Sequence, residues 1–418
     1  MKQRIAVVGG GISGLTAAWY LSKNHDVELF EAGEELGGHT CTVPVSRPHG
    51  QYSIDMGFIV FNDRTYPNFE RLLQALALQG QPTSMGFAVS DQHNGLEYCG
   101  DGLGGVFARK RNWLSPAHWR FVAEILRFNR EAPGLLNDPG ADMPLGEYLD
   151  RHGYSERFRR DYVLAMGGAI WSCSLSQMEA FPARFFIRFF DHHGLLALKD
   201  RPQWYVVPGG SSEYVARLAK NIQARLHVSS PVTRVERNDQ EVRVHTGGEI
   251  KVFDQIVFAC HSDQILPLLA DPDDREQAAL PVLEYQGNEV VLHTDIRLLP
   301  KRQRVWSSWN ALLDDTPQQR VQVTYNMNIL QGIDAPETFC VTLNATDRID
   351  PDRILATRHF AHPLFTPDTE KARDVLLKGN GHNRTWYAGA WCRNGFHEDG
   401  VVSALNVVKG ITGSGGPL

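Results

Sequence analysis

Four residues near the start of the chain have the types and the spacing needed to hold a dinucleotide. Gly9, Gly11 and Gly14 form a GxGxxG pattern directly after the apolar run 5–8, and Glu31 follows a second apolar run. In such a pattern the first glycine allows a tight turn, the second lets a pyrophosphate approach the backbone, and the third lets a helix pack on the strand. Glu31 is then placed to accept hydrogen bonds from ribose hydroxyls. The order of these features predicts a dinucleotide-binding unit over 5–31.

A second GxGxxG pattern occurs at Gly100, Gly102 and Gly105. Only a short strand candidate precedes it, and Asn112 and Pro116 interrupt the segment that follows before any second strand. We therefore predict a loop at 100–105 and one dinucleotide site in the chain. One site argues against a reductase that binds two dinucleotides.

The composition limits the class of protein. The 418 residues exceed one ordinary core, so two domains are expected, and 42% hydrophobic with 22% charged residues is typical of a globular protein. A net charge of -6 gives no reason to expect nucleic acid. No apolar run is long enough for a membrane span, and residues 1–4 lead straight into a strand instead of a signal peptide. The six scattered cysteines indicate free thiols, so we expect a cytoplasmic location.

The chain changes character along its length. Residues 66–202 are mainly helical in pattern, with helices predicted at 67–77, 116–131, 144–152 and 155–166. Strands are predicted at 204–207, 232–237, 242–246 and 255–259, and again at 289–294, 320–325, 338–343 and 353–360. The last four alternate polar and apolar residues, which predicts an antiparallel sheet with one solvated or ligand-facing side. The segment 385–411 returns to strand, glycine-rich turn and helix.

These patterns predict an α/β fold whose dinucleotide domain is discontinuous. We assign residues 1–65, 203–270 and 380–411 to a Rossmann-like domain. An inserted substrate domain combines a mainly helical cap at 66–202 with a sheet at 271–379. Residues 412–418 are expected to form a flexible tail, because glycine, serine and proline dominate them.

The residues after Glu31 narrow the nature of the cofactor. They include a second glycine pair, Gly37-Gly38, followed by His39-Thr40. This extension resembles the flavoprotein superfamily of monoamine oxidases, phytoene desaturases and protoporphyrinogen oxidases, whose members usually read GGR here. The resemblance implies a monoamine-oxidase-like fold and a non-covalently held FAD. Because His39 replaces the usual arginine, a direct charge contact with the pyrophosphate is in doubt.

Further stretches resemble a bacterial branch of that superfamily. They are the segments 55–62, 208–211, 362–365 and 395–400, and the resemblance runs from about residue 3 to residue 408. The branch includes flavoproteins linked to fatty-acid modification, and it is similar to the flavoprotein-like N-terminal region of plant cyclopropane fatty acid synthases.

The resemblance also implies which residues hold the FAD. Val235 is expected to offer backbone hydrogen bonds to the adenine, and the helix after Gly400 to point its positive end at the flavin. Asp399 would bond the ribityl chain or phosphate region, cap that helix, or do both. The expected cofactor-binding residues are Gly9, Gly11, Ile12, Ser13, Gly14, Glu31, Ala32, Gly37, Gly38, His39, Thr40, Gly57, Phe58, Val235, Gly389, Phe396, Asp399 and Gly400.

Candidates for the chemical step are few. His397 and Glu398 sit beside the expected flavin edge and could exchange a proton, although both could instead hydrogen-bond local backbone. No lysine can be assigned to hold a water at the flavin, as amine oxidases often do, because Lys301 lies in an apparently exposed basic turn.

Other side chains are weighed as ligands. Tyr325 and Trp391 either line the substrate space or pack in a core. Cys392 is not expected to attach the flavin. His359 and His362 are spaced i, i+3 without further ligands, so no metal site is expected.

Two segments combine aromatic and basic residues. Phe181–Phe190 is studded with arginine, and Arg109–Trp113 leads into a basic amphipathic helix at Trp119–Arg130. Either segment packs a helical cap with snorkelling arginines, or it makes a peripheral contact with an anionic membrane surface.

Together these features predict an FAD-dependent oxidoreductase. Its expected substrate is a small molecule or lipid, above all an apolar one such as a modified fatty acyl chain, which it would oxidise or desaturate by hydride transfer to flavin. Two alternatives stay open. One is a flavin-dependent amine oxidase, and the other is a non-catalytic flavoprotein that partners a lipid-modifying methyltransferase.

Overall fold

A five-stranded parallel sheet forms the base of the structure, a computed structural model that describes residues 2–91, 94–100, 102–138, 143–197, 199–313 and 320–413. Its strand order is β10-β2-β1-β14-β20. The bounds are Arg4–Val8 for β1, Asp26–Phe30 for β2, Arg225–His227 for β10, Gln255–Phe258 for β14 and Thr385–Tyr387 for β20. Strands from the start, the middle and the end of the chain therefore pair in one sheet, and the expected discontinuous α/β fold is confirmed.

Both faces of this sheet are covered because side chains alternate along each strand. Ile5 and Val7 of β1 face one apolar core, and Ala6 and Val8 face the other. The first core is closed by four helices: α1 (Ile12–Leu21), α2 (Pro67–Ala75), α10 (Ser212–Asn221) and α15 (His397–Thr412). The second is closed by the antiparallel strands β11 (Val232–Arg237), β12 (Val242–Thr246) and β13 (Glu249–Phe253), together with α11 (Ile265–Leu268), α12 (Asp274–Ala279) and α14 (Pro367–Lys378).

A seven-stranded sheet stands beside this base, with the order β19-β15-β18-β17-β16-β7-β8. Its strands are β7 (Phe87–Asp91), β8 (Glu97–Cys99), β15 (Tyr285–His293), β16 (Trp309–Leu313), β17 (Gln322–Asn326), β18 (Cys340–Leu343) and β19 (Ile354–Pro363). All neighbours pair antiparallel except β7 and β16, which are parallel. Two strands thus come from the segment 66–202 that we expected to be mainly helical, and α2 from the same segment packs on the parallel-sheet core.

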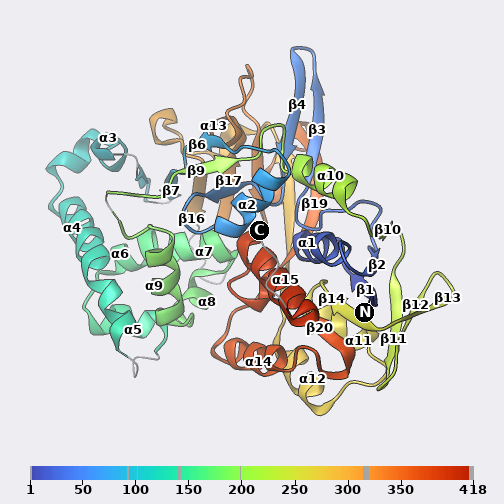
Figure 1. Cartoon of the computed structure of the whole chain (residues 1–418). Coiled ribbons are helices and arrows are strands. Elements are labelled where there is room, and N and C mark those ends of the chain that lie inside the picture. The colour runs from blue at the N-terminus through green and yellow to red at the C-terminus, as the bar shows by residue number, and fades with distance from the viewer. Residues whose placement is uncertain are drawn as a thin grey trace.

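The remaining part of that segment forms the helical cap at one end of the molecule, seen at the left of Figure 1. Its helices are α3 (Gly102–Val106), α4 (Pro116–Glu131), α5 (Leu145–Arg151), α6 (Glu156–Phe158), α7 (Ala165–Trp171), α8 (Leu175–Glu179) and α9 (Ala183–His192). A π-helical stretch at Arg159–Leu164 joins α6 to α7, where we expected a continuous helix. The prediction of a loop at 100–105 is wrong, because residues 102–106 form α3, and a Cβ at Gly105 would overlap Cys99 of the preceding strand.

Short elements connect these layers. The hairpin β3 (Thr42–Arg47) and β4 (Gly50–Asp55) leads to β5 (Val60–Asn62), which pairs with β9 (Trp204–Val206); β9 also pairs with β6 (Gln81–Thr83), and α13 (Met327–Gln331) follows β17. Of the expected tail at 412–418, residues 414–418 lie outside the described part of the chain. No helix within the described residues is long and apolar enough to cross a bilayer.

Candidate functional site

The turn after β1 is built by glycines that no other residue could replace without displacement of the backbone. Gly9 has a φ of +107°, and a Cβ there would lie 2.8 Å from the carbonyl carbon of Ala259. A Cβ at Gly14 would overlap the carbonyl oxygen of Gly9. The expected roles of the first and third glycine, a tight turn and close helix packing, are thus visible in the geometry.

The opposite side of this turn is open. A Cβ at Gly11 would meet only the Cα of Gly38, at 4.0 Å. Gly11 is the N-cap of α1 and supplies no side chain, so the first amides of the helix, at Ile12 and Ser13, have no partner within it. Backbone N–H groups and the positive end of the helix dipole therefore point to one place, which fits a pyrophosphate.

Glu31 and the second glycine pair close around the same turn. The Glu31 carboxylate accepts hydrogen bonds from the amides of Gly10 (2.6 Å) and Gly33 (2.7 Å). Gly37 and Gly38 both have positive φ, +129° and +59°, and the Gly37 amide donates to the Gly10 carbonyl at 2.9 Å. Since a carboxylate has about four lone-pair sites, Glu31 keeps acceptors for ribose hydroxyls, as the sequence predicts.

His39 lies in a cluster of aromatic rings, and its own ring is uncharged. Its centroid is 5.5 Å from those of His261 and His362 and 5.2 Å from that of Phe360, and its Nε2 donates to the carbonyl of Ala361 at 3.0 Å. Burial, and then the nearby His261, lower the pKa of His39 to about 4. The ring is therefore neutral near pH 7, which agrees with the doubt about a charge contact from this position.

His397 is held by neighbours on both sides. Its ring stacks on Phe58 at 3.6 Å, and its Nε2 accepts a hydrogen bond from the Tyr214 hydroxyl at 2.7 Å. The Tyr214 oxygen also lies 2.6 Å from Oγ1 of Thr40. Burial lowers the pKa of His397 to about 3. This arrangement gives His397 a structural role and does not support the weak expectation that it exchanges a proton with substrate.

The two carboxylates that follow it cap helices. Glu398 accepts hydrogen bonds from the Asn68 side chain (2.6 Å) and from the backbone amides of Asn68 and Phe69 (3.1 and 2.8 Å), so it caps the start of α2. Asp399 accepts from the amides of Phe396 (3.0 Å) and Asn394 (3.2 Å) at the start of its own helix, α15. Glu398 is thus a cap rather than an evident acid or base, and the capping alternative for Asp399 is the one that the structure displays.

The starts of α1 and α15 meet at this site, and Figure 1 draws the two helices side by side. A Cβ at Gly400 would lie 2.8 Å from both Ile12 Cγ2 and Ser13 Oγ. Gly57 is equally close-packed, because a Cβ there would overlap the His39 carbonyl oxygen. The structure therefore brings together expected cofactor residues from the beginning, from the hairpin region and from the end of the chain.

Val235 does not share this surface. It is fully buried in the core, and its carbonyl accepts a hydrogen bond from Ala270 at 2.9 Å. Two residues before Val232, Ser230 donates its amide to the Glu31 carbonyl at 2.8 Å. A break in register between Val232 and Arg234 separates the two valines. The placement of Val235 beside the adenine stays a prediction.

The two aromatic residues expected near substrate behave differently. Trp391 is 3% exposed and donates its Nε1 to the Cys260 carbonyl at 3.2 Å, so it packs in the core and does not line a substrate space. Gly389 precedes it, held by a 2.9 Å hydrogen bond from its amide to Ser403. Tyr325 is half-buried on β17 and packs edge-on against Trp309 at 5.0 Å.

Four phenylalanines form a cluster beside the start of α15. This cluster was not predicted from the sequence. Phe185 of α9 stacks on Phe365 at 5.2 Å, and Phe189 stacks on Phe396 at 4.9 Å. Trp171 lies behind Phe189 at 4.9 Å. We call Phe185, Phe189, Phe365 and Phe396 the phenylalanine wall. The sequence features that could have predicted this cluster are the aromatic run at 181–190 and the two separate motifs that contain Phe365 and Phe396.

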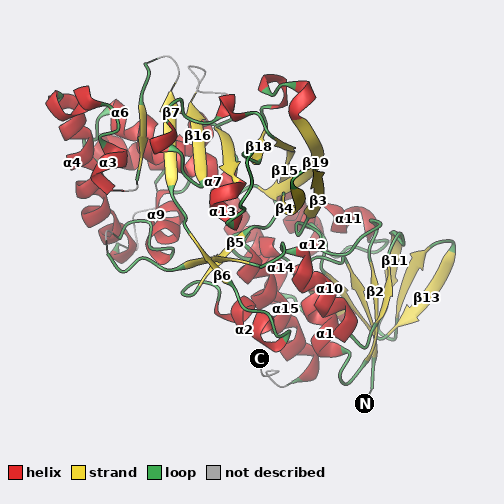
Figure 2. Ribbon diagram, turned by 90° about the horizontal axis from the view of Figure 1, so that it is seen from above, coloured by secondary structure: helices red, strands yellow, loops and turns green. Residues whose placement is uncertain are grey.

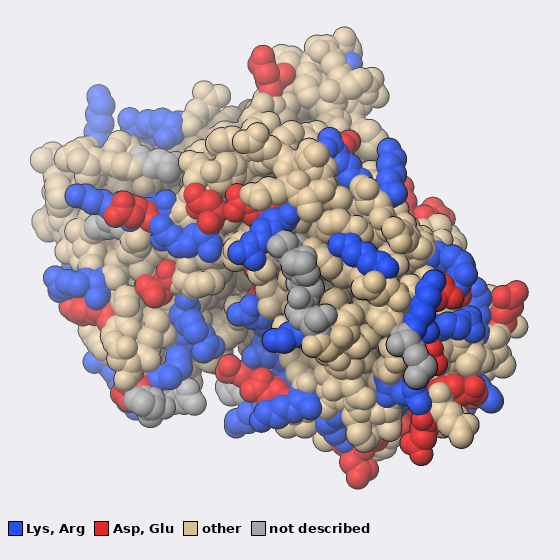
Figure 3. Space-filling model, in the orientation of Figure 1, with Lys and Arg blue, Asp and Glu red and all other residues tan. Residues whose placement is uncertain are grey.

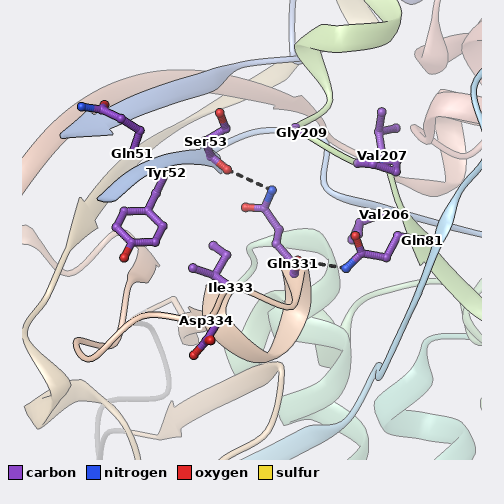
Figure 4. Close-up of a pocket in the computed structure, with 12 residues that line it drawn as sticks. Gln51, Tyr52, Ser53, Gln81, Val206, Val207, Gly209, Gln331, Ile333 and Asp334 are labelled. Atoms are coloured by element: carbon purple, nitrogen blue, oxygen red, sulfur yellow. Dashed lines mark hydrogen bonds between the residues drawn. The ribbon is translucent and has the colours of Figure 1, made fainter. Parts of the chain in front are cut away.

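Two hollows are open to solvent near these elements. One of about 190 Å³ lies at the start of α15 and is lined by Phe396, His193, Asn68, Arg64, Arg393 and neighbouring residues. The other, of about 290 Å³, lies beyond the hairpin β3–β4 and is shown in Figure 4. There the Gln331 side chain donates to the Ser53 carbonyl at 3.2 Å, and Gln81 donates to the Gln331 carbonyl at 3.3 Å. The second hollow is lined by a mixture of polar and apolar residues, none of which belongs to the phenylalanine wall.

The structure also locates the remaining candidates. Every lysine of the chain is a described residue and none is buried; Lys301, whose amide donates to Glu97, is exposed. His359 is exposed, whereas Nδ1 of His362 accepts a hydrogen bond from Asn288 at 2.9 Å. Within the described residues, no group of three or more acidic, histidine or cysteine side chains could hold a metal ion.

Comparisons with known proteins agree with this geometry. The model of the family "Flavin containing amine oxidoreductase" matches residues 12–312. A putative flavin-containing monoamine oxidase of Mycobacterium tuberculosis is 24% identical over 254 residues, which are 57% of this chain and 53% of that protein, so the match spans about half of the relative.

Solved structures share the fold. A fatty acid isomerase from P. acnes that produces CLA has a TM-score of 0.71 at 17% identity, covering 97% of this chain and 98% of that one. Cyclohexylamine oxidase from Brevibacterium oxydans has a TM-score of 0.70 at 15% identity, covering 99% and 100%. With the glycine turn, Glu31 and the meeting of α1 with α15 in place, the chain belongs to the flavin-containing amine oxidoreductase family, and the dinucleotide that its site is built for is FAD.

Proposed function

We propose that this chain is an FAD-dependent oxidoreductase that acts on a largely apolar substrate, such as a modified fatty acyl chain, and oxidises or desaturates it. The observation that carries the proposal is the phenylalanine wall, which joins α9, the segment after β19 and the start of α15. FAD, when bound, supplies the acceptor for the hydride. The wall supplies apolar contact for the substrate and keeps water away from the reacting bond.

Two histidines near the wall are uncharged, and two carboxylates at the start of α15 are taken up by helix caps. Burial lowers the pKa of His39 to about 4 and that of His362 to about 3, so both rings are neutral near pH 7. The carboxylates of Glu398 and Asp399 accept hydrogen bonds from backbone amides at the starts of α2 and α15. These four side chains therefore offer no free carboxylate to pair with an ammonium group, which favours an alkyl chain over an amine.

The lysine that holds a water at the flavin in many amine oxidases has no counterpart in the interior, since none of the lysines is buried. The names of the relatives include both chemistries: the protein from Mycobacterium tuberculosis is named for monoamine oxidation, and the one from P. acnes for fatty acid isomerisation. The neighbour that acts on a fatty acid supports a test with acyl substrates first.

The test is an anaerobic titration of the purified holoprotein. Fatty acids and acyl esters of several chain lengths, and in parallel primary amines, are added while the visible absorbance of the flavin is recorded. We expect acyl substrates to bleach the flavin, and mass spectrometry of the extracted product to show the loss of two hydrogens.

Two outcomes would overturn the proposal. Bleaching by amines but not by acyl substrates would assign the protein to amine oxidation. A flavin that is reduced by light but by none of these substrates, in a protein that binds a lipid methyltransferase tightly, would assign it a non-catalytic partner role.

A further inference from the structure

The two aromatic and basic segments of the sequence differ in how deeply their apolar side chains are buried. The phenylalanines of α9 are buried: Phe185 and Phe189 are 8% and 7% exposed, and Phe186 and Phe190 are fully buried. That helix therefore packs the cap, as one of the two sequence interpretations holds. The segment 103–119 instead carries large apolar side chains on the surface.

Four of these side chains form an exposed apolar face. Leu114 is 88% exposed, Leu103 is 65% exposed, and Trp113 and Trp119 are each 47% exposed. Both tryptophans rest on Phe107, at 4.3 and 4.7 Å, and the Trp119 Nε1 donates to the Trp113 carbonyl at 3.0 Å. We call Leu103, Trp113, Leu114 and Trp119 the tryptophan face. Because its rings are held from behind, it is a fixed surface rather than a loose loop.

The segment that carries this face is rich in basic residues. The sequence from 102 to 123 contains Arg109, Lys110, Arg111 and Arg120 and no acidic residue. Among the described residues, Lys110 and Arg111 take part in no ion pair, while Arg120 lies 3.4 Å from Glu124. Figure 3 shows blue side chains at its upper left, the end at which Figure 1 draws α3 and α4. A net charge of -6 for the whole chain makes this basic end unusual.

Arg109 has charged neighbours of both signs, since Glu97 lies near it as well as Arg111 and Arg302. Burial, followed by repulsion from Arg111 and Arg302, lowers the pKa of its guanidinium. Arg302 comes from a distant part of the chain and forms an ion pair with the buried Glu97. Within the described part of the chain, the unpaired positive charge of the rim therefore comes from Lys110 and Arg111.

We propose that the tryptophan face docks this protein on an anionic lipid bilayer. The indole rings would lie at the level of the headgroups, Leu114 would enter the acyl region, and Lys110 with Arg111 would meet lipid phosphates. The occupant is chosen by charge: an anionic surface complements a face whose rim is basic, whereas a second copy of the same face would bring like charges together.

The experiment is sedimentation of the holoprotein with vesicles of phosphatidylglycerol and phosphatidylcholine, compared with vesicles of phosphatidylcholine alone. We expect binding to the anionic vesicles that falls as salt is raised. Lys110→Gln with Arg111→Gln should weaken it about 30-fold, from roughly 1 kcal/mol per basic residue at such a surface. Leu114→Ser should weaken it about tenfold by the loss of buried apolar area.

The first of two matched controls lies at the opposite end of the molecule, where Figures 1 and 2 both draw β13. Ile250→Ser there removes a side chain that is 58% exposed, and Lys371→Gln on α14 removes an exposed charge; neither should change vesicle binding. Flavin absorbance confirms that every variant is folded. Quenching of tryptophan fluorescence by brominated lipid, reduced in Trp113→Phe, reports the insertion directly.

The proposal is overturned if the wild type does not bind anionic vesicles, or if the variants bind as the wild type does. It is equally overturned if the protein forms a dimer in solution that Leu114→Ser dissociates, because the face then belongs to a second copy. These results do not depend on whether acyl substrates bleach the flavin, so failure of the docking and failure of the proposed function are separable.

Discussion

The imidazole of His397 lies parallel to the ring of Phe58, with centroids 3.6 Å apart and 7° between the planes. The two residues come from opposite ends of the chain. Their stack fixes the first turn of α15 against the segment that leaves the β3–β4 hairpin, and the Tyr214 hydroxyl completes it through a hydrogen bond to Nε2 of His397. Burial lowers the pKa of His397 to about 3, so the ring is neutral near pH 7 and acts as a structural support.

Removal of that donor tests the structural role of His397. Tyr214→Phe should lower the free energy of unfolding by about 1 kcal/mol, because the buried Nε2 of His397 loses its 2.7 Å partner and keeps only the Thr40 hydroxyl at 3.3 Å. The pH profile of turnover should keep its shape, since a neutral support moves no proton. Tyr205→Phe on β9, whose hydroxyl makes no hydrogen bond within the described residues, is the control for chemical denaturation. A displaced pH profile in Tyr214→Phe would instead place His397 in the chemistry.

The close packing at Gly14 should make it intolerant of even one methyl group. In Gly14→Ala the Cβ overlaps the Gly9 carbonyl oxygen, so α1 must move away from the phosphate turn. We expect protein that purifies without FAD, as read from its absorbance. Gly104→Ala is the matched control from the second glycine-rich stretch, because a Cβ there meets nothing within 4 Å. Full FAD content in Gly14→Ala would show that the turn does not carry the cofactor.

Acid should weaken the protein through Glu28. This residue is 3% exposed; burial raises its pKa, but hydrogen bonds from Lys251, His227 and Arg225 outweigh that and hold the pKa at about 2. A carboxyl with a lowered folded-state pKa stabilises the fold above its unfolded value, and this stability is lost as the pH falls from about 5 to 2.

The corresponding variant is Glu28→Gln, which should cost about 3 kcal/mol near pH 7 and much less at low pH, by the usual conversion of about 1.4 kcal/mol for each pKa unit. Thermal unfolding at a series of pH values measures this. Glu34→Gln, at an exposed position, should leave the profile unchanged. An equal loss of stability at all pH values would point to packing rather than ionisation.

The phenylalanine wall should decide how well apolar substrates bind. Phe189→Ala removes the ring between Trp171 and Phe396, and kcat/KM for acyl substrates should fall at least about tenfold, since one apolar group in a pocket is worth about 1–3 kcal/mol. Phe128→Ala, a fully buried ring of α4 in the same core, should cost similar stability without this loss. Equal kinetic effects of the two variants would remove the wall from the substrate site.

Local rules explain why some parts of this site can be predicted from sequence. The turn at 9–14 needs glycines for steric reasons that act within a few residues, and Glu31 follows from the length of one helix and two strands. The helix at 116–131 is likewise marked at its start, by Ser115 as N-cap and Pro116 in the first turn.

Other parts depend on pairings that no local pattern records. Glu398 looked like a candidate acid until the fold placed it against Asn68 and Phe69, 330 and 329 residues away. The break in strand register between Val232 and Arg234 is likewise set by pairing with β12 and not by a local pattern. The strand at Phe87–Asp91 was hidden in a helical segment because its partner, Trp309–Leu313, lies far along the chain.

The order of strands in the parallel sheet has a consequence for how the protein folds during its synthesis on the ribosome. β1 pairs with β14, and β14 pairs with β20, so the phosphate turn cannot be locked in place until almost the whole chain has been made. A helix that meets Ile12 and Ser13 arrives even later. Pairing of strands so far apart in the chain is slow. Nascent chains therefore keep an unformed phosphate turn and an exposed sheet edge until synthesis is nearly complete. Capture of flavin should therefore be among the last events of maturation, and a cell short of flavin would accumulate chains in that unfinished form.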